Sequence, residues 1–290
     1  MVIGGFNNSR IHEAEFVDFS HDGNAMLRQP SDLSYGMYGL VAGFVDDHVI
    51  ACGGYKDSNC FLYNFRFNWW RQTVSMDTQR KGSVSFMNGD NTWYVMGGRD
   101  YSTIPNTYLN TTLVYNDGKF EQGQMMPYGA YFACSATVNE THIFFAGGHD
   151  EDRLRSDAYL LEVGTWTWTR LEDMAVAREY HSCGRAGRNI VVVGGYAANG
   201  AEGTSEIFNL DTMTWSAGPG VPTSSRYYRA GQTFQLEDTF YLMGGFNGNT
   251  YLDTVFEFVP EFGIWTERKE RMMTARDRFA VVPVPRRLLE

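Results

Sequence analysis

The sequence predicts an all-β fold, a six-bladed β-propeller built from four-stranded blades. Three observations lead to this prediction: a glycine doublet recurs six times, each doublet ends a strand-like run, and a pair of large side chains follows most doublets. The doublets recur about every 48 residues. Four-stranded units repeated with a period of 40 to 50 residues are typical of propellers. Because the six repeats account for the whole chain, we predict a single domain over residues 1–290.

The glycine doublets mark the end of one strand in every repeat. Apolar, β-branched or aromatic runs such as "HVIACGG" and "IVVVGG" precede them and are expected to be buried strands. Two glycines at a strand end permit positive φ angles and a close approach of the neighbouring backbone. The six doublets are Gly4-Gly5, Gly53-Gly54, Gly97-Gly98, Gly147-Gly148, Gly194-Gly195 and Gly244-Gly245.

A pair of large side chains about seven residues apart follows in each repeat. We expect each pair to lie on a hairpin and to pack against the neighbouring unit. In two repeats the pair is weaker (Leu161 with Trp168, and Phe19 with Met26), and in one it is shorter (Tyr115 with Phe120). The clearest pairs are Tyr63 with Trp70, Phe208 with Trp215 and Phe258 with Trp265. No segment with a convincing helical period separates these strands.

The first repeat begins with its second strand, "MVIGGF", and no first strand precedes it. We expect the missing strand at the other end of the sequence, in "RFAVVP" (residues 278–283). Pairing of Val2–Gly4 with Phe279–Val282 would close the ring and protect both strand edges.

Composition excludes several classes of partner. The chain is 43% hydrophobic and 20% charged, with a formal net charge of −10 and a pI near 5.1. A chain this acidic repels a phosphate backbone, so we predict no nucleic-acid partner. The apolar runs are too short to span a bilayer, and no secretion-signal pattern opens the sequence, so we predict no membrane association.

The cysteines are interpreted as free thiols of a reduced, cytoplasmic protein. Cys52, Cys60, Cys134 and Cys183 form no CxxC pair and no zinc-ligand spacing. A Cys52–Cys60 bridge across a hairpin is the alternative. Sequons at Asn7, Asn110 and Asn139 are close to the number that chance provides and indicate little about secretion.

The repeat pattern resembles the Kelch repeat, in which a strand ending in Gly-Gly is followed by an aromatic residue and then by Tyr or Phe and Trp seven residues apart. Six copies cover essentially all of the chain. Among Kelch proteins it most resembles the six-bladed propellers of BTB–Kelch (Kelch-like) adaptors. That resemblance implies that the C-terminal strand completes the first blade, as the pairing above also predicts.

No pattern indicates an enzyme, a metal site or a cofactor. The six histidines form no HxH or HxxxH pair, and neither a GxSxG elbow nor a Walker loop is present. Copper-binding and iron-binding patterns known from other Kelch propellers are not found. His149 and His181 are expected in consecutive blades, where we interpret them as hydrogen-bonding groups, since a metal site needs three or four ligands.

The residues that lead into each innermost strand provide the candidate binding site. In a propeller these loops emerge on the same face as the loops that follow the glycine doublets, so together they ring one mouth of the channel. We align the leading segments as Tyr35–Tyr38, Arg80–Ser83, Tyr128–Tyr131, Arg178–His181, Arg226–Arg229 and Arg276–Phe279. The predicted partner-binding residues are Tyr38, Tyr55, Arg80, Arg99, Tyr131, His149, Arg178, Tyr180, His181, Tyr196, Arg226, Tyr228, Arg229, Phe246, Arg276 and Arg278.

Arginine and tyrosine dominate protein-recognition hot spots, and arginine forks suit acidic groups. The alternative for any one arginine is structural: its stem is packed and its head is bonded to loop carbonyls. In BTB–Kelch adaptors this face holds a short substrate segment, and arginines at matching positions contact its acidic groups. Tyr35 and Tyr128 stand where the pattern has arginine, which favours a mixed acidic and aromatic peptide here.

The leading hypothesis is therefore a non-enzymatic substrate-recognition domain that binds a protein or peptide with acidic groups. A link to a cullin ubiquitin ligase would require domains that are not in this sequence. The alternatives are an actin-binding cytoskeletal Kelch protein and a sugar-binding or enzymatic extracellular propeller.

Overall fold

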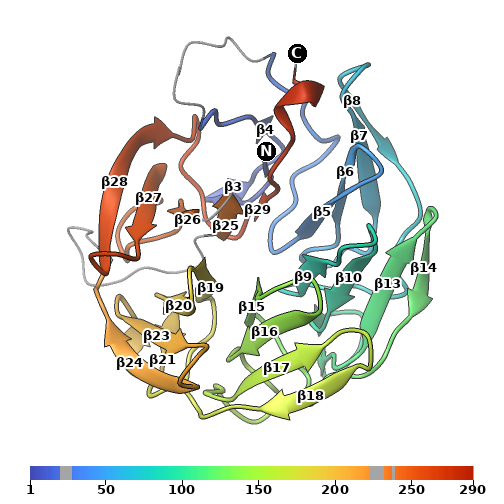
Figure 1. The fold of residues 1–290 in the computed structure, drawn as a ribbon. Helices are drawn as coiled ribbons and strands as arrows, with labels where there is room; N and C mark the ends of the chain where they lie inside the picture. Colours follow the sequence, from blue (N-terminus) through green and yellow to red (C-terminus); the bar gives the residue numbers. More distant parts are fainter. Residues whose placement is uncertain (20–27, 222–231, 237–238, 290) are drawn as a thin grey trace.

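The computed structural model of the chain describes residues 1–19, 28–221, 232–236 and 239–289. Six sheets surround a central channel, so the predicted six-bladed propeller is confirmed (Figure 1). Within the described residues the only helix is a short 3-10 turn, η1 (Arg286–Leu288), and no helix is long and apolar enough to cross a membrane.

Five blades have four antiparallel strands each, and the innermost strand of each blade faces the channel. Blade 1 contains β5 (Val41–Val45), β6 (His48–Cys52), β7 (Cys60–Asn64) and β8 (Trp69–Gln72). Blade 2 contains β9 (Val84–Met87), β10 (Trp93–Met96), β13 (Thr112–Asn116) and β14 (Lys119–Gln122). Blade 3 contains β15 (Cys134–Thr137), β16 (His142–Ala146), β17 (Ala158–Glu162) and β18 (Thr167–Arg170).

The remaining strands continue the same order around the ring. Blade 4 contains β19 (Ser182–Ala186), β20 (Asn189–Val193), β23 (Ser205–Asn209) and β24 (Thr214–Gly218). Blade 5 contains β25 (Gln232–Leu236), β26 (Thr239–Met243), β27 (Thr254–Val259) and β28 (Ile264–Arg271). Three short hairpins follow glycine doublets: β2 (Phe6–Asn7) with β3 (Ser9–Arg10), β11 (Arg99–Asp100) with β12 (Thr107–Tyr108), and β21 (Tyr196–Ala197) with β22 (Gly200–Ala201).

Blade 6 joins the two ends of the chain and confirms the predicted closure. Its described strands are β29 (Ala280–Val281), β1 (Val2–Ile3) and β4 (Ala14–Glu15), in that order from the channel outward. Val2 lies opposite Val281, and Ile3 lies opposite Ala280. In Figure 1 the red C-terminal strand accordingly lies beside the blue N-terminal one.

The predicted hairpin pairs are direct cross-strand neighbours. Tyr63 faces Trp70, Phe208 faces Trp215 and Phe258 faces Trp265. The weaker Leu161–Trp168 and shorter Tyr115–Phe120 pairs adopt the same arrangement. The Phe19–Met26 pair falls partly outside the described residues.

Large aromatic rings also fill the space between blades, and glycine on the neighbouring inner strand makes room for them. A Cβ atom at Gly43 would lie 2.8 Å from the Trp93 ring, and one at Gly184 would lie 2.1 Å from the Phe240 ring. Both rings are essentially inaccessible to solvent. Each blade therefore buries a face that it cannot bury alone.

The glycine doublets connect consecutive blades through the backbone. In five of the six doublets the second glycine donates its N–H to a carbonyl at the start of the next blade within the described residues, as Gly54 does to Arg80 and Gly148 does to Arg178, at 2.9 and 2.8 Å. All of these second glycines have positive φ. Only glycine adopts this conformation readily, which explains the recurrence of the doublet.

A second series of backbone bonds runs around the channel mouth through five of the six blades within the described residues. Tyr180 N–H donates to the Phe132 carbonyl, Phe132 to Gly82, Gly82 to Gly39 and Gly39 to Arg278, at 2.7 to 3.0 Å. All five residues have positive φ. Because each occupies the same position in its blade, the series aligns the blades residue by residue.

The interpretation of the cysteines as free thiols is wrong. Cys52 is bonded to Cys60 across the paired strands β6 and β7, which was the alternative, and Cys134 is bonded to Cys183. The second pair is 49 residues apart, close to one repeat, so the cysteines lie near the starts of neighbouring inner strands β15 and β19. The predicted cytoplasmic location loses the support of free thiols, since disulfides persist mainly in oxidising compartments.

Candidate binding site at the channel mouth

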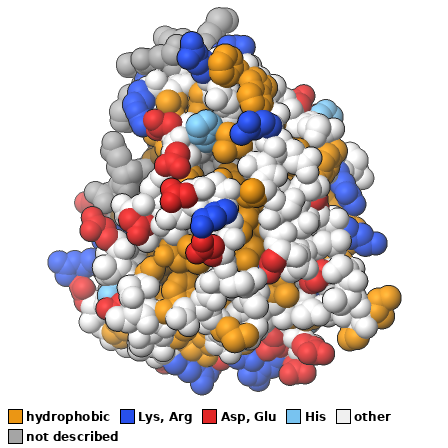
Figure 2. Space-filling model, turned by 90° about the vertical axis from the view of Figure 1, so that its right-hand side faces the viewer, with side chains coloured by type: hydrophobic (Ala, Val, Ile, Leu, Met, Phe, Trp, Pro, Cys, Tyr) orange, Lys and Arg blue, Asp and Glu red, His pale blue; other side chains and the backbone are white. Residues whose placement is uncertain are grey.

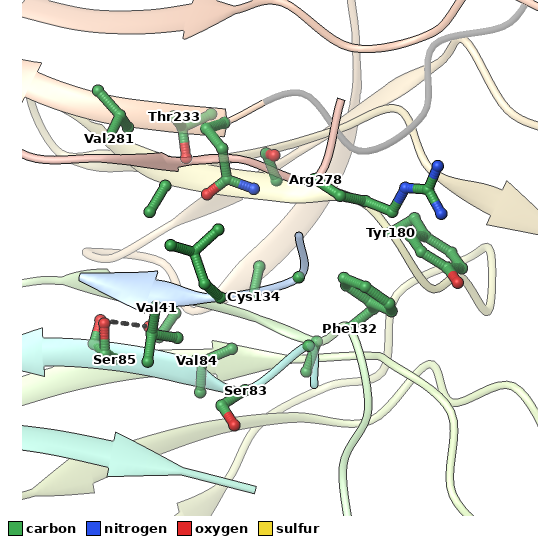
Figure 3. Close-up of a pocket in the computed structure, with 18 of the residues that line it drawn as sticks. Val41, Ser83, Val84, Ser85, Phe132, Cys134, Tyr180, Thr233, Arg278 and Val281 are labelled. Carbon is green, nitrogen blue, oxygen red and sulfur yellow. Dashed lines mark hydrogen bonds between the residues drawn. The ribbon is translucent and has the colours of Figure 1, made fainter. Parts of the chain in front are cut away.

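The central channel contains a cavity of about 190 Å³ that all six inner strands line. Figure 3 shows Phe132, Tyr180 and Arg278 together at one end of this cavity, with Val41, Thr233 and Val281 further along it. This end is the predicted mouth, where the loops into the inner strands meet the residues that follow the glycine doublets.

Three of the predicted arginines do not reach the mouth surface. Arg80, Arg178 and Arg276 are each no more than 1% exposed. Each donates from Nη1 to the first-glycine carbonyl of the doublet in its own blade, Gly97, Gly194 or Gly4, at 2.8 to 3.0 Å. The structural alternative therefore holds for these three residues, and the prediction that they contact a ligand does not.

Each buried guanidinium also has an acidic partner. Arg178 contacts Glu206 at 2.7 Å, Arg276 contacts Glu15 at 2.8 Å and Arg80 contacts Asp77 at 3.2 Å. Burial lowers the pKa of Arg80 and of Arg276, and the paired carboxylates oppose this effect. Burial also disfavours the charged form of Glu15, and for a carboxyl group this raises the pKa. Loss of one member of such a pair leaves an uncompensated buried charge.

The sequence alignment of the leading segments is two residues out of register in blades 1 and 3. Met37 and Ala130 occupy the position of the buried arginine, because their carbonyls accept from Gly5 and Gly98 as the arginine carbonyls do elsewhere. The Tyr128 hydroxyl donates to the Gly147 carbonyl at 2.7 Å. In blade 3 this hydroxyl therefore satisfies the carbonyl that a guanidinium satisfies in blades 2, 4 and 6.

His181 is also structural rather than part of a binding surface. The ring is 5% exposed, and its Nε2 lies 3.1 Å from the Ala146 carbonyl. Burial, and secondarily the charge of Arg178, lower the pKa of His181 to about 3, so the ring is neutral. His149 lies instead at the mouth, where its ring stacks on Tyr108 with centroids 5.5 Å apart.

A continuous group of aromatic rings covers the mouth, and we call it the aromatic belt. Tyr38 stacks on Tyr55 at 5.5 Å, and Tyr55 meets Tyr101 at 4.9 Å. The Tyr131 hydroxyl lies 3.3 Å from that of Tyr101 and 3.2 Å from that of Tyr180. Phe132 stacks on Tyr180 at 3.9 Å. The belt consists of Tyr38, Tyr55, Tyr101, Tyr131, Phe132 and Tyr180.

Two of the predicted arginines lie on aromatic faces at the mouth. The Arg99 guanidinium carbon lies 4.8 Å from the Tyr108 ring centre and 5.1 Å from that of Tyr101. The Arg278 guanidinium carbon lies 4.5 Å from the Phe6 ring centre, and its Nε donates to Asp277 at 2.8 Å. Both side chains are partly exposed. Arginines supported in this way keep donors for an acidic ligand.

Sequence reasoning missed Lys81, which lies at the centre of the belt. Its Nζ is 5.1 to 5.6 Å from the ring centres of Tyr38, Tyr55, Tyr101, Tyr131 and Phe132. Gly39 makes this position possible, since a Cβ atom there would lie 2.8 Å from Lys81 Cγ. Burial, then the neighbouring Arg278 and Arg99, lower the pKa of Lys81 to about 8.

Sequence reasoning also missed Tyr101 and Tyr108, which belong to the β11–β12 hairpin. The available signal was the length of this segment. The segment between Gly98 and β13 is longer than the equivalent segment between Gly54 and β7.

The mouth is not uniformly basic. In each of five blades one described residue takes part in the backbone bonds around the mouth. The residue directly before it is Lys81 in blade 2, but it is Glu179 in blade 4 and Asp277 in blade 6. Charges of both signs are also interspersed on the outer face that Figure 2 shows. The prediction counted the arginines and not these acidic residues, so it overstated the positive charge of the rim.

The remaining predicted residues lie at the periphery or outside the described chain. Tyr196 is 40% exposed, and the half-buried Phe246 ring lies 5.0 Å from Tyr251. Arg226, Tyr228 and Arg229 lie outside the described residues. Among the residues that are described, no three His, Cys, Asp or Glu side chains are grouped to hold a metal ion.

Comparison with known proteins identifies the repeat family. A family profile described as the KLHDC2/KLHL20/DRC7 Kelch-repeats domain matches residues 118–289, more than half of the chain. The chain belongs to this Kelch-repeat family. Kelch-repeat domains typically mediate protein–protein interactions and are typically non-enzymatic.

Several curated proteins are similar to parts of this Kelch chain. F-box/kelch-repeat protein At1g15670 of Arabidopsis thaliana is 34% identical over 101 residues, which cover 32% of this chain and 28% of that protein. Kelch domain-containing protein 3 of Bos taurus is 26% identical over 153 residues, which cover 47% of this chain and 40% of that protein. The chain thus spans less than half the length of these relatives.

Proposed function

We propose that this Kelch domain binds a short peptide segment of a partner protein, with acidic and aromatic side chains, at the mouth of the channel. The observation that carries the proposal is the placement of Arg99 and Arg278 on aromatic faces, partly exposed, beside the aromatic belt. Tyrosine and arginine anchors are the side chains that dominate protein interfaces. The matching position in BTB–Kelch propellers also receives acidic groups.

We further propose that binding serves an adaptor role, in which the propeller selects a protein for another component. Two relatives are named F-box/kelch-repeat proteins, which is consistent with a Kelch propeller joined to a second module. A cullin ligase is the assembly that the resemblance to BTB–Kelch adaptors favours. Affinity purification of the full-length protein followed by mass spectrometry tests this role, and recovery of partners without any ligase component would contradict it.

Peptide binding is tested with matched probes and matched variants. The probes are fluorescent peptides that combine Asp or Glu with Tyr or Trp, each paired with a copy that carries Asn or Gln instead. Fluorescence anisotropy should detect binding of the acidic peptides only, and the affinity should fall with added salt because the contact is ionic.

The variant Arg99→Met should weaken this binding about 10- to 100-fold, as expected for a hydrogen bond to a charged group. The matched control is Arg188→Met, which removes the same charge from an 80% exposed side chain in the β19–β20 turn, at the opposite end of the blade. Equal affinities for the two variants, or equal affinities for the acidic and amide peptides, would refute the proposal.

A further inference from the structure

Lys81 is a buried cation without an ion-pair partner among the described residues. It is 7% exposed, and its Nζ has neither a hydrogen-bond acceptor nor a carboxylate within ion-pair distance among the described residues. The other three lysines of the chain, Lys56, Lys119 and Lys269, are exposed. Buried charges in proteins are usually paired, so the arrangement around Lys81 requires a reason.

The surroundings hold the ammonium group in place but do not neutralise it. Five rings of the belt present their faces at 5.1 to 5.6 Å, which favours a cation. Arg278 and Arg99 repel it, whereas Glu179 and Asp277 attract it from beyond ion-pair distance. Among the described residues, the other titratable groups shown against it are four of the five rings, Tyr38, Tyr55, Tyr101 and Tyr131.

Lys81 and Arg99 are paired on the backbone. Lys81 N–H donates to the Arg99 carbonyl at 3.2 Å, and Arg99 N–H donates to the Lys81 carbonyl at 2.9 Å. The two cations therefore come from adjacent positions of one blade, on the side of the mouth where the short β11–β12 hairpin stands. A single anionic group between them would supply the ion-pair partner that Lys81 lacks, and it would reduce the repulsion between the two cations.

We infer that Lys81 is the anchor of the channel mouth for one carboxylate group, supplied by an Asp or Glu side chain of the bound peptide, with Arg99 as the second contact. This inference rests on the proposed function and names the residue that receives the acidic group. A carboxylate is favoured over a phosphate group because Glu179 and Asp277 at equivalent positions of the rim repel a doubly charged anion more strongly.

The test follows Lys81 directly in the intact chain. Reductive methylation with [13C]formaldehyde labels all four lysines as dimethylammonium groups, which retain their charge and report it by NMR. Acetyl-aspartate amide should shift the Lys81 resonance and raise its titration midpoint, while the resonances of the three exposed lysines stay unchanged. Acetyl-asparagine amide is the matched control. A Lys81 resonance that ignores the aspartate probe, or that responds equally to both probes, would overturn the inference.

Acetyl-phosphoserine amide forms the second arm of the NMR experiment. It should shift the Lys81 resonance only at higher concentration than the aspartate probe. A response to phosphoserine at lower concentration would overturn the assignment to a carboxylate.

Binding of the acidic peptides to Lys81→Met separates the inference from the proposed function. We expect an affinity about 10- to 100-fold below that of the unchanged chain, with Arg188→Met as the control. Peptides that bind Lys81→Met normally would refute the anchor and leave the peptide site intact. Failure of every acidic peptide to bind, with Lys81 still responding to aspartate, would refute the peptide site and leave the anion site.

Discussion

Replacement of Arg178 by Met tests whether the buried arginines are structural. The substitution keeps an unbranched apolar stem but removes the guanidinium, which donates to the carbonyls of Gly194 and Thr204 at 2.9 and 3.2 Å. It also leaves Glu206 buried without its cation, although this carboxylate still accepts from the Ala175 and Val176 N–H groups. Breaking such a buried pair costs about 3–5 kcal/mol.

Urea unfolding followed by circular dichroism measures this loss. Thermal unfolding gives a second readout: at roughly 2–4 °C per kcal/mol for a chain of this size, the melting temperature should fall by roughly 6–20 °C. Arg188→Met, whose ion pair with Asp211 is exposed, should change stability by less than about 1 kcal/mol. The double variant Arg178→Met with Glu206→Met should recover part of the loss, because no unpaired charge remains. An Arg178→Met protein as stable as Arg188→Met would refute the structural assignment.

Four further predictions follow from particular contacts. Replacing Cys134 and Cys183 by Ser should cost about 4 kcal/mol and replacing Cys52 and Cys60 about 2.5 kcal/mol, because the closed loops differ in length; equal losses in urea unfolding would contradict this. Burial lowers the pKa of His181 to about 3, below its unfolded value, so the stability that the neutral ring contributes is present above pH 6.5 and lost as the pH falls. His181 should account for about 3 kcal/mol of destabilisation between pH 6.5 and pH 4, and His181→Gln should show a correspondingly flatter pH profile of unfolding. Gly184→Ala should destabilise the chain by about 1–3 kcal/mol, since its Cβ would overlap the Phe240 ring, whereas Gly164→Ala, with no atom within 4 Å of its Cβ position and no positive φ, should cost less; the reverse order would contradict the packing. Because burial and the nearby arginines lower the pKa of Lys81 to about 8, affinity for an acidic peptide should fall about tenfold between pH 7 and pH 9, and a flat profile would exclude Lys81 as the anchor.

The repeat made most of the fold predictable. Glycine doublets and large hairpin pairs are backbone and packing requirements that every blade shares, so six copies reinforced one another. The closure of blade 6 was predictable for the same reason, because a second strand without a first strand needs a partner from elsewhere in the chain. The Cys134–Cys183 pair was missed because pairing across blades depends on the three-dimensional repeat and not on local spacing, whereas the local Cys52–Cys60 bridge was the stated alternative.

The candidate site was less predictable than the fold. Arg80, Arg99 and Arg278 are the same residue type near the same loops, yet the first is buried and the other two are partly exposed. In blade 6 a shift of two residues decides the role: Arg276 is buried, whereas Arg278 takes part in the backbone bonds around the mouth and is partly exposed. Lys81 was overlooked because its position depends on Gly39 of the neighbouring blade, which no pattern within its own repeat reveals.

The central claim is that the channel mouth is the surface that receives the peptide, and photo-crosslinking tests it most directly. An acidic peptide that binds in the anisotropy assay is synthesised with a diazirine side chain, irradiated on the protein and mapped by mass spectrometry. We predict adducts in residues 80–82, 99–108 and 277–279, around Lys81, Arg99 and Arg278. Adducts confined to the outer strands, such as β8 or β28, would contradict the account.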